Sequence, residues 1–396
     1  MNNCLFLSSE VRIFAENIGK MKATSNPFIT SGRVPVELFC DRQEESQRLI
    51  QELTNGANIV LISPRRVGKT QLLLYCFDKP PIQDNYITIF IDILKTSTLQ
   101  EFTFELGKAV FNTLATRGQK MQKMLMATMR SLTGNIGFDP VTALPTFGIS
   151  IGDIHNPTYS LEEIFRTLEQ AETRCIVAID EFQQITNYPE KHIEALLRSH
   201  IQQSSNAQFV FSGSERHLLE EMFLGSVRPF YNSADIQSLD VISEEKYADF
   251  VQHHFEANGK HIERDVIHQV YILFDGNTYY NQKTFREAYA NTVQGETCSI
   301  ETTERAITLM IREANRHYSE ILARLNLSQK ELLYAIAREH RAKRITSNAF
   351  IRKHSLPSAS SIQSAVKKLL SASLVSTTSG EYCIADQLMR LWLIRS

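Results

Sequence analysis

Residues 58–70 read Asn-Ile-Val-Leu-Ile-Ser-Pro-Arg-Arg-Val-Gly-Lys-Thr. The first part of this stretch, residues 59–62, is wholly apolar and mostly β-branched, which is typical of a strand buried on both faces of a parallel sheet. Good helix formers follow Thr70 and predict a helix. A strand, a Gly-Lys-Thr loop and a helix in this order form the context in which the motif binds phosphate. The alternative is an accidental Gly-Lys-Thr in an exposed turn.

This phosphate-binding loop, or P-loop, predicts a set of nucleotide ligands. Its backbone N–H groups and the N-terminus of the next helix would face the phosphates. Lys69 would contact the β- and γ-phosphates, and Thr70 would give its hydroxyl to Mg²⁺. Ser63 stands where the motif has glycine. The predicted cofactors are ATP and Mg²⁺, and the predicted cofactor-binding residues are Ser63, Pro64, Arg65, Arg66, Val67, Gly68, Lys69, Thr70 and Gln71.

A second informative stretch, residues 175–183, reads Cys-Ile-Val-Ala-Ile-Asp-Glu-Phe-Gln. An apolar strand that ends in Asp-Glu is the pattern of a Walker B segment. Asp180 would hold Mg²⁺ through a water, and Glu181 would orient and deprotonate the attacking water. A buried strand that exits into acidic, solvent-exposed residues is the alternative, and the P-loop upstream favours the Walker B interpretation.

The composition is that of an ordinary globular protein. The chain has 396 residues, of which 43% are hydrophobic and 22% charged, and this length predicts two or three domains. No apolar run approaches the roughly 20 residues that span a bilayer, and no secretory signal is evident at the start. The six cysteines are scattered without a Cys-x-x-Cys pair. This pattern indicates reduced thiols and a cytoplasmic location, and it argues against a zinc site.

Five apolar segments alternate with helical patterns and predict an α/β fold, a P-loop NTPase with a five-stranded parallel sheet. The predicted strands are residues 59–62, 86–92, 175–180, 208–214 and 236–241. Ligands of such sheets bind beyond the carboxyl ends of the strands. At the end of the fourth strand, Ser212 or Ser214 would sense the γ-phosphate, although Ser-Gly-Ser is also ordinary turn chemistry. Residues 120–157 show no clear period, and we expect an insertion or a mobile loop there.

Local signals set the predicted domain limits and helix starts. Residues 1–25 are predicted to be a disordered leader, and residues 26–242 the P-loop ATPase domain. Asp41 is the predicted N-cap of a helix that reaches about residue 53. Capping boxes at residues 160–163 and 328–331 predict two further helix starts.

The C-terminal part is helical and then basic. Residues 243–326 predict a helical lid domain. Residues 327–396 predict three helices and a hairpin, which is a winged helix-turn-helix. Residues 326–396 hold 11 Lys and Arg against 4 Asp and Glu, although the whole chain carries a net charge of −2. The third helix, with Gln363 near its start, would contact DNA mainly through phosphates. The alternative is that the basic residues are a solvated face or dock on the acidic ATPase body.

With the P-loop and the Walker B segment both located, the chain resembles prokaryotic (archaeal-type) P-loop ATPases that are related to the AAA+ and STAND NTPases. The resemblance runs from about residue 26 to the C-terminus. The residues that carry it are Asn26-Pro27-Phe28, Phe39-x-x-Arg42-x-x-Glu45, residues 64–70, residues 179–183, Ser212-Gly213-Ser214, Pro229-Phe230-Tyr231, Tyr382-x-Ile384-x-Asp386 and Leu391-Trp392-Leu393.

Two further departures from the family pattern affect the expected site. The Pro-x-Tyr stretch continues into Asn232-Ser233 where the family has Gly-Arg, so an arginine for the γ-phosphate is missing there and Arg228 is the candidate substitute. The lid motif reads Gly276-Asn277-Thr278, without the proline that accompanies an adenine contact.

The resemblance implies an ATP-binding, Mg²⁺-dependent ATPase that acts as a nucleotide-dependent switch with slow turnover. The predicted catalytic residues are Glu181, Lys69, Ser212 and Arg228, and the predicted metal ligands are Thr70 and Asp180. The alternatives are an ATP-sensing DNA-binding regulator and a protein-docking scaffold, both with negligible turnover. The sequence leaves the oligomeric state open.

Overall fold

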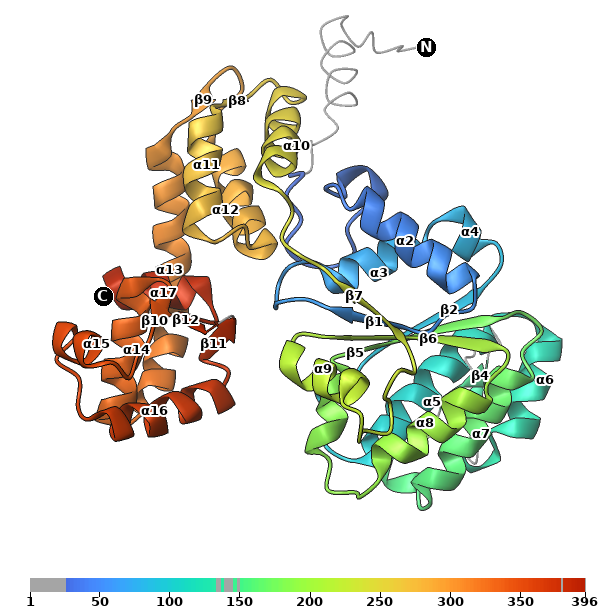
Figure 1. Cartoon of the computed structure of the whole chain (residues 1–396). Helices are drawn as coiled ribbons and strands as arrows, with labels where there is room; N and C mark the ends of the chain where they lie inside the picture. The colour runs from blue at the N-terminus through green and yellow to red at the C-terminus, as the bar shows by residue number, and fades with distance from the viewer. Residues whose placement is uncertain (1–25, 133–136, 139–144, 148–149, 379, 396) are drawn as a thin grey trace, which may run out of the picture. The chain divides into compact units, whose positions relative to one another are not determined.

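The computed structural model describes residues 26–132, 137–138, 145–147, 150–378 and 380–395 (Figure 1). The chain divides into two compact units. Residues 33–242 form the first, here called the sheet unit, and residues 26–32 with 243–395 form the second, here called the helical unit. The prediction of a disordered leader at residues 1–25 lies outside the described residues, and the sequence-based domain limits stay a prediction.

The sheet unit is built on a five-stranded parallel sheet, as the sequence predicts. Its strands are ordered β2 (Ile87–Asp92), β5 (Cys175–Asp180), β6 (Ala207–Gly213), β1 (Ile59–Ile62) and β7 (Asp235–Ser238). All four neighbouring pairs are parallel. Strand β6 therefore lies between the strand of the P-loop and the strand of the Walker B segment, and the carboxyl ends of all three open at one edge of the sheet.

Helices cover both faces of this sheet (Figure 1). On one face lie α2 (Gln43–Thr54), α3 (Lys69–Phe77) and α4 (Pro80–Gln83). On the other lie α5 (Leu99–Ala115), α7 (Pro157–Glu169) and α8 (Ile193–Gln203). Alternate residues of β1 enter the two apolar clusters, with Ile59 and Leu61 in one and Val60 and Ile62 in the other. This two-sided burial is why the strand is apolar at every position.

Residues 120–157 hold more regular structure than the sequence predicts. They include most of α6 (Gln119–Thr128), a 3₁₀ turn at Arg130–Leu132, and a two-stranded antiparallel ladder of β3 (Gly137–Phe138) and β4 (Pro145–Thr146). The buried Glu163 carboxylate of α7 accepts bonds from Ser131 N at 2.9 Å and Ser131 Oγ at 2.6 Å. These bonds fix the turn after α6 against α7, so the described part of this segment is not a loop, and the alternative of an insertion stays a prediction.

Three predicted helix starts are wrong by a few residues. Helix α7 begins at Pro157, where Asn156 accepts a hydrogen bond from Tyr159 N. Pro157 is pre-set for a first helical position, so the helix starts ahead of the Ser160 box. Helix α14 begins at Leu327, because Asn326 and Gln329 form the capping box in place of residues 328–331. Helix α2 follows Arg42, which has a left-handed backbone and no side-chain cap, so Asp41 is not the N-cap.

The helical unit starts with four helices, α10 (Glu244–Glu256), α11 (Arg264–Leu273), α12 (Thr278–Asn291) and α13 (Ile300–Ala323). A short parallel pair, β8 (His261–Ile262) and β9 (Thr297–Cys298), ties their connections together. The buried ring of Phe28 lies among aromatic side chains of α10 and α12, namely Phe250, His254, Phe255, Phe285 and Tyr289. Residues 26–32, which the sequence assigns to the ATPase domain, thus pack with the helical unit.

The C-terminal part of this unit is a winged helix, as predicted. It contains α14 (Leu327–Glu339), α15 (Asn348–Lys353) and α16 (Ala359–Ser371), and a sheet ordered β10 (Ala342–Lys343), β12 (Glu381–Ile384), β11 (Val375–Thr378). A final helix, α17 (Gln387–Arg395), is not among the predicted elements. At its start Asp386 accepts hydrogen bonds from Tyr280 of α12 at 2.5 Å and Tyr318 of α13 at 3.2 Å.

Among the described residues, no helix is long and apolar enough to cross a membrane. The five cysteines in that part of the chain (Cys40, Cys76, Cys175, Cys298 and Cys383) are free thiols. Burial raises the pKa of Cys76 and of Cys175 to about 12, so both stay protonated and unreactive at neutral pH.

Candidate nucleotide site

The P-loop joins β1 to α3 through two left-handed backbone positions, Arg66 at φ 66° and Gly68 at φ 98°. No atom lies within 4 Å of a Cβ placed on Gly68, so glycine is needed there for its backbone conformation and not for space. The Ser63 hydroxyl donates to the Pro64 carbonyl at 2.9 Å and closes the turn where the motif has glycine. Backbone N–H groups of such a turn and of the first turn of α3 form an anion-binding concavity.

Lys69 is the first residue of α3 and is 6% exposed. Its ammonium forms no hydrogen bond or ion pair with the part of the chain that the structure describes. Burial lowers the pKa of Lys69, whereas the charges of Glu181 and Asp180 raise it. A buried cation without a direct partner is costly. This position therefore favours binding of an anion such as phosphate.

Three side chains that end in oxygen, from three segments, meet beside Lys69. Thr70 Oγ1 donates to one oxygen of Asp180 at 2.6 Å, and Ser212 Oγ donates to the other at 2.6 Å. Thr70 follows β1, Asp180 ends β5, and Ser212 lies on β6 between them, so the strand order brings these predicted residues together. Hydroxyl and carboxylate oxygens suit Mg²⁺. No group of three or more His, Cys, Asp or Glu in the described ranges could hold a metal, but Mg²⁺ commonly uses one carboxylate with phosphate and water.

Glu181 follows β5 in a left-handed backbone conformation, at φ 56°. Its Oε2 accepts hydrogen bonds from Gln183 Nε2 at 2.6 Å and Ser214 Oγ at 2.8 Å. Ser214 Oγ in turn accepts a bond from Arg65 Nε at 3.2 Å. A chain of polar contacts thus joins the P-loop to the Walker B carboxylate, and both serines that the sequence offers as sensors lie at the site.

Sequence reasoning missed two residues of this region, Asp92 and the side chain of Gln183. Asp92 ends β2 in register with Asp180. Burial raises the pKa of the Asp92 carboxyl, the hydrogen bond from Leu94 N opposes this, and the charges of Asp180 and Glu181 add to it. An apolar strand that ends in Asp, as residues 87–92 do, was the available signal.

Two predicted residues make their contacts elsewhere. Arg228 contacts Glu194 at 2.5 Å and Glu221 at 3.5 Å, and neither carboxylate belongs to the P-loop or the Walker B segment. The side-chain oxygen of Gln71 accepts a bond from Val34 N at 3.0 Å, so this oxygen is engaged away from the phosphate-binding turn.

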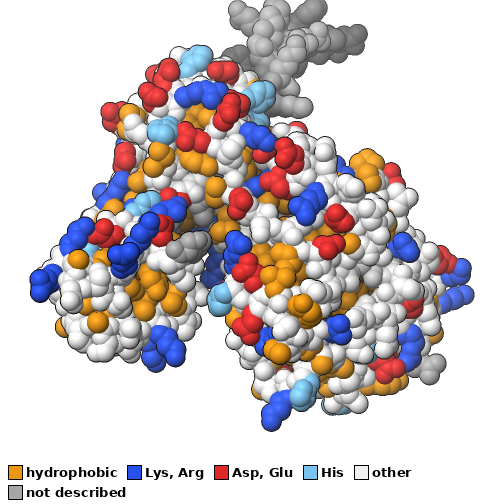
Figure 2. Space-filling model, in the orientation of Figure 1, with side chains coloured by type: hydrophobic (Ala, Val, Ile, Leu, Met, Phe, Trp, Pro, Cys, Tyr) orange, Lys and Arg blue, Asp and Glu red, His pale blue; other side chains and the backbone are white. Residues whose placement is uncertain are grey.

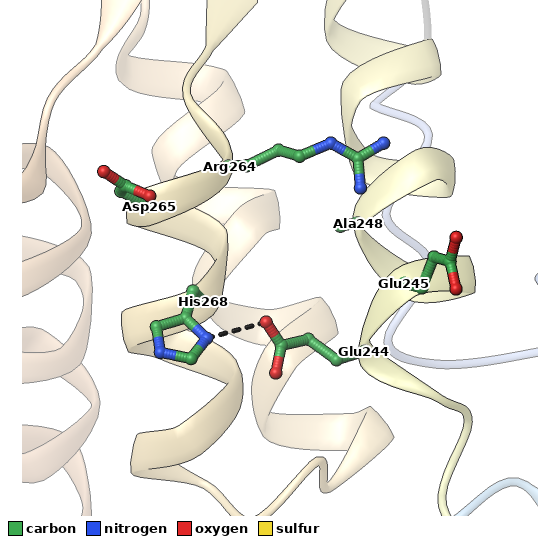
Figure 3. Close-up of a pocket in the computed structure, with 6 residues that line it drawn as sticks. All are labelled: Glu244, Glu245, Ala248, Arg264, Asp265 and His268. Atoms are coloured by element: carbon green, nitrogen blue, oxygen red, sulfur yellow. Dashed lines mark hydrogen bonds and ion pairs between the residues drawn. The ribbon is translucent and has the colours of Figure 1, made fainter.

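An open groove between α10 and α11 in the helical unit contains none of the predicted site residues (Figure 3). In that view Arg264 and His268 extend from α11 toward α10, and His268 Nδ1 lies 2.7 Å from Glu244 Oε1. The other residues lining the groove are Glu245, Ala248 and Asp265. Three acidic side chains among six lining residues disfavour a nucleotide there.

Comparisons with known proteins agree with this geometry. Residues 39–283 match the model of an ATPase domain that occurs predominantly in Archaea. The chain belongs to this ATPase family. Residues 316–395 match the model of a probable winged helix domain, as the predicted architecture requires. A search of curated proteins gives no match.

Solved structures of similar fold cover nearly the whole of this archaeal-type ATPase. The Walker-type ATPase PABY2304 of Pyrococcus abyssi is 19% identical, with a TM-score of 0.64 over 93% of this chain and 99% of that chain. The ORC2 protein of Aeropyrum pernix, solved as ADPNP–ADP complexes, is 13% identical, with a TM-score of 0.58 over 94% of this chain and 96% of that one. At these identities the likeness concerns the fold. It confirms the predicted P-loop ATPase architecture with a winged helix.

Proposed function

We propose that this ATPase binds ATP with Mg²⁺ at the P-loop and hydrolyses it slowly. The observation that carries the proposal is the buried ammonium of Lys69, which has no partner among the described residues, beside the Thr70–Asp180–Ser212 cluster. Thr70 and Asp180 would hold Mg²⁺, which neutralises phosphate charge when bound. Backbone groups of residues 63–71 would bind the phosphates, and Ser212 would sense the γ-phosphate.

Glu181 is the proposed base for the attacking water, because its carboxylate lies beyond the strand end next to the metal ligand Asp180. Arg228 stays a prediction. Its pair with Glu194 would have to open before its guanidinium could reach a phosphate. This need for a rearrangement supports slow basal turnover and a role as a nucleotide-dependent switch.

Phosphate release from ATP by the full chain, measured with and without Mg²⁺, tests the proposal. We expect release that needs Mg²⁺. Tight ATP binding without release would assign the chain to the alternative, a regulator that senses ATP and does not turn it over. No binding at millimolar Mg²⁺-ATP would contradict the proposal as a whole.

DNA is the second candidate ligand, and the charge pattern of the winged helix favours it. Ion pairs within the helical unit hold Arg341, Lys343 and Lys353. In contrast, five exposed cations of the winged helix form no ion pair with any residue that the structure describes: Arg338, Arg344, Arg352, Lys367 and Lys368. Lys367 and Lys368 share the exposed side of α16 with Gln363. These free charges suit phosphate contacts without base readout. Figure 2 shows Lys and Arg side chains scattered over one face of the winged helix.

A salt titration of duplex DNA binding by the full chain tests this second candidate. Log affinity should fall linearly with log salt by about 0.9 for each neutralised phosphate. Changing Lys367 and Lys368 to Ala should reduce the slope by about two such contacts, whereas Lys343→Ala should change it less because Glu381 already pairs Lys343. Absence of binding at low salt would assign the basic face to protein docking.

A further inference from the structure

Only one of the two oxygens of the Glu181 carboxylate accepts hydrogen bonds from the described residues. Both hydrogen bonds that reach the Glu181 carboxylate in the described structure, from Gln183 Nε2 and Ser214 Oγ, end on the same oxygen, Oε2. Oε1 accepts none from the described residues. One carboxylate oxygen is therefore fixed by two donors and the other is left for a further ligand.

The backbone around Gln183 explains this arrangement. The left-handed turn at Glu181 sends the chain from β5 directly into a 3₁₀ helix, Phe182–Asn187. The side chain of Gln183, 3% exposed, then lies against the end of β6. A Cβ on Gly213 would stand 2.0 Å from Gln183 Oε1, so this close approach needs glycine. The amide is packed in one place and has little rotamer freedom.

The other end of the Gln183 amide has no partner in the part of the chain that the structure describes. Its Oε1 is buried and accepts no hydrogen bond within the described ranges. A buried glutamine that served stability alone would satisfy both ends of its amide. Turning the amide over would place Oε1 against the Glu181 carboxylate, where two acceptors repel. The observed orientation thus serves the carboxylate and leaves the amide oxygen unpaired.

We propose that Gln183 is a positioning residue, which holds Glu181 Oε2 so that Oε1 faces the attacking water. This inference rests on the proposed function. In the step that it serves, Oε1 takes one proton of the water as the water oxygen bonds to the γ-phosphorus. The bond from that phosphorus to the bridging oxygen breaks, and ADP leaves with the electron pair. Gln183 touches neither ATP nor the water and acts through Glu181.

Ser214 is the second donor, and it connects the position of Glu181 to the P-loop. Its hydroxyl donates to Glu181 and accepts from Arg65 Nε. Arg65 also lies 3.8 Å from Glu215, so this carboxylate competes with Ser214 for its guanidinium. The position of the Ser214 hydroxyl thus depends on the long, exposed side chain of Arg65, whereas burial fixes the side chain of Gln183. Removal of Gln183 should therefore disturb Glu181 more than removal of Ser214.

The test replaces Gln183 by Met in the full chain. Met keeps the length and shape of the side chain but removes the donor and the unpaired oxygen. We expect kcat to fall about tenfold to a hundredfold, since misplacing a reacting group by about 1 Å has effects of this size. KM for ATP should stay within about twofold, because Gln183 does not contact the nucleotide. The melting temperature should change little, because the hydrogen bond to Glu181 is lost together with the unpaired buried oxygen. Gln184→Met, one residue on in the same 3₁₀ helix, is the matched control. Its amide bonds Thr96 O at 2.9 Å, away from Glu181, and its kcat should stay at the wild-type value.

The same substitution in a Glu181→Gln background separates positioning from a structural role. If Gln183 acts through Glu181, Gln183→Met adds no further loss to the residual rate and leaves ATP affinity unchanged there. A wild-type or higher kcat in the single variant, or an equal further loss in the Glu181→Gln background, would overturn the inference. Should Glu181→Gln itself turn over at the wild-type rate, the assignment of the base would fail first, independently of Gln183.

Discussion

The buried ammonium of Lys69 makes the nucleotide site accessible to a thermal-shift experiment with Lys69→Met. This variant keeps most of the side-chain length and removes the charge. In the absence of nucleotide it should melt at the wild-type temperature or above, because a buried cation without a direct partner is lost. A defect in folding would instead lower the melting temperature, so the apo measurement serves as an internal control.

The magnitude of the ligand effect follows from linkage. At a Mg²⁺-ATP concentration of one hundred times the dissociation constant, the wild type gains about 2.7 kcal/mol. For a unit of this size that gain is about 5 to 10 °C in melting temperature. Loss of one buried charge pair costs about 3 kcal/mol, which weakens binding more than a hundredfold. At the same ATP concentration the variant should therefore gain at most about 0.4 kcal/mol, or about 1 °C.

The assay is a melting curve of each protein with and without Mg²⁺-ATP. Lys108→Met on α5 is the control, because Lys108 is exposed and its ammonium lies 5.7 Å from the Phe104 ring. The control should keep the full shift. An equal shift in the Lys69 variant and in wild type would refute the view that Lys69 binds the phosphates.

Two further predictions concern packing and pH. Gly213→Ala should lower the melting temperature by the equivalent of about 1–3 kcal/mol, because the new Cβ overlaps Gln183 Oε1. Adding Gln183→Ala should restore the melting temperature. If the second change does not help, the overlap with Leu219, 2.8 Å from that Cβ, is the one that destabilises the protein. Burial, with a contribution from the charge of His253, lowers the pKa of His254 in the folded helical unit. As the pH falls, the unfolded state therefore takes up a proton on His254 before the folded state does, at about pH 6.5. The free energy of unfolding should fall as the pH drops from 7 toward 5. His254→Phe should flatten this dependence in chemical unfolding measured across that range, and an unchanged pH slope would contradict the prediction.

The positions of the strands in the sequence were the most predictable part of the structure, and the order of the strands in the sheet was the least predictable part. Residues 59–62 were predicted to the residue as β1, and residues 208–214 differ from β6 by one residue. Full burial makes each strand apolar, and that property is local. The order β2-β5-β6-β1-β7 depends on contacts between segments that are distant in the sequence. Val60 with Phe211 and Ile62 with Ser238 are each more than a hundred residues apart. The residues near each strand in a single sequence do not predict which other strand it pairs with.

The site was predictable where a motif names the residue. Thr70, Asp180 and Ser212 were singled out from the sequence, and the structure brings them together. The sequence places Gln183 in the Walker B stretch but predicts no role for it. Its hydrogen bond to Glu181 depends on the left-handed backbone of Glu181, which no residue type in this stretch predicts. The misplaced start of α7 has a similar cause. Asn156-Pro157 and the Ser160 box are both valid local signals. In the structure Ser160 lies inside α7, and its hydroxyl contacts Ser131 at 2.7 Å in place of capping the helix.

Turnover by Glu181→Gln compared with wild type tests the central claim most directly. Gln keeps the size of the side chain and its hydrogen-bonding reach but cannot take a proton from water. The account predicts that this variant binds Mg²⁺-ATP with wild-type affinity and releases phosphate at least a hundredfold more slowly, in line with the usual contribution of a general base of about 10²–10⁴. Phosphate release at the wild-type rate, with ATP affinity unchanged, would contradict it.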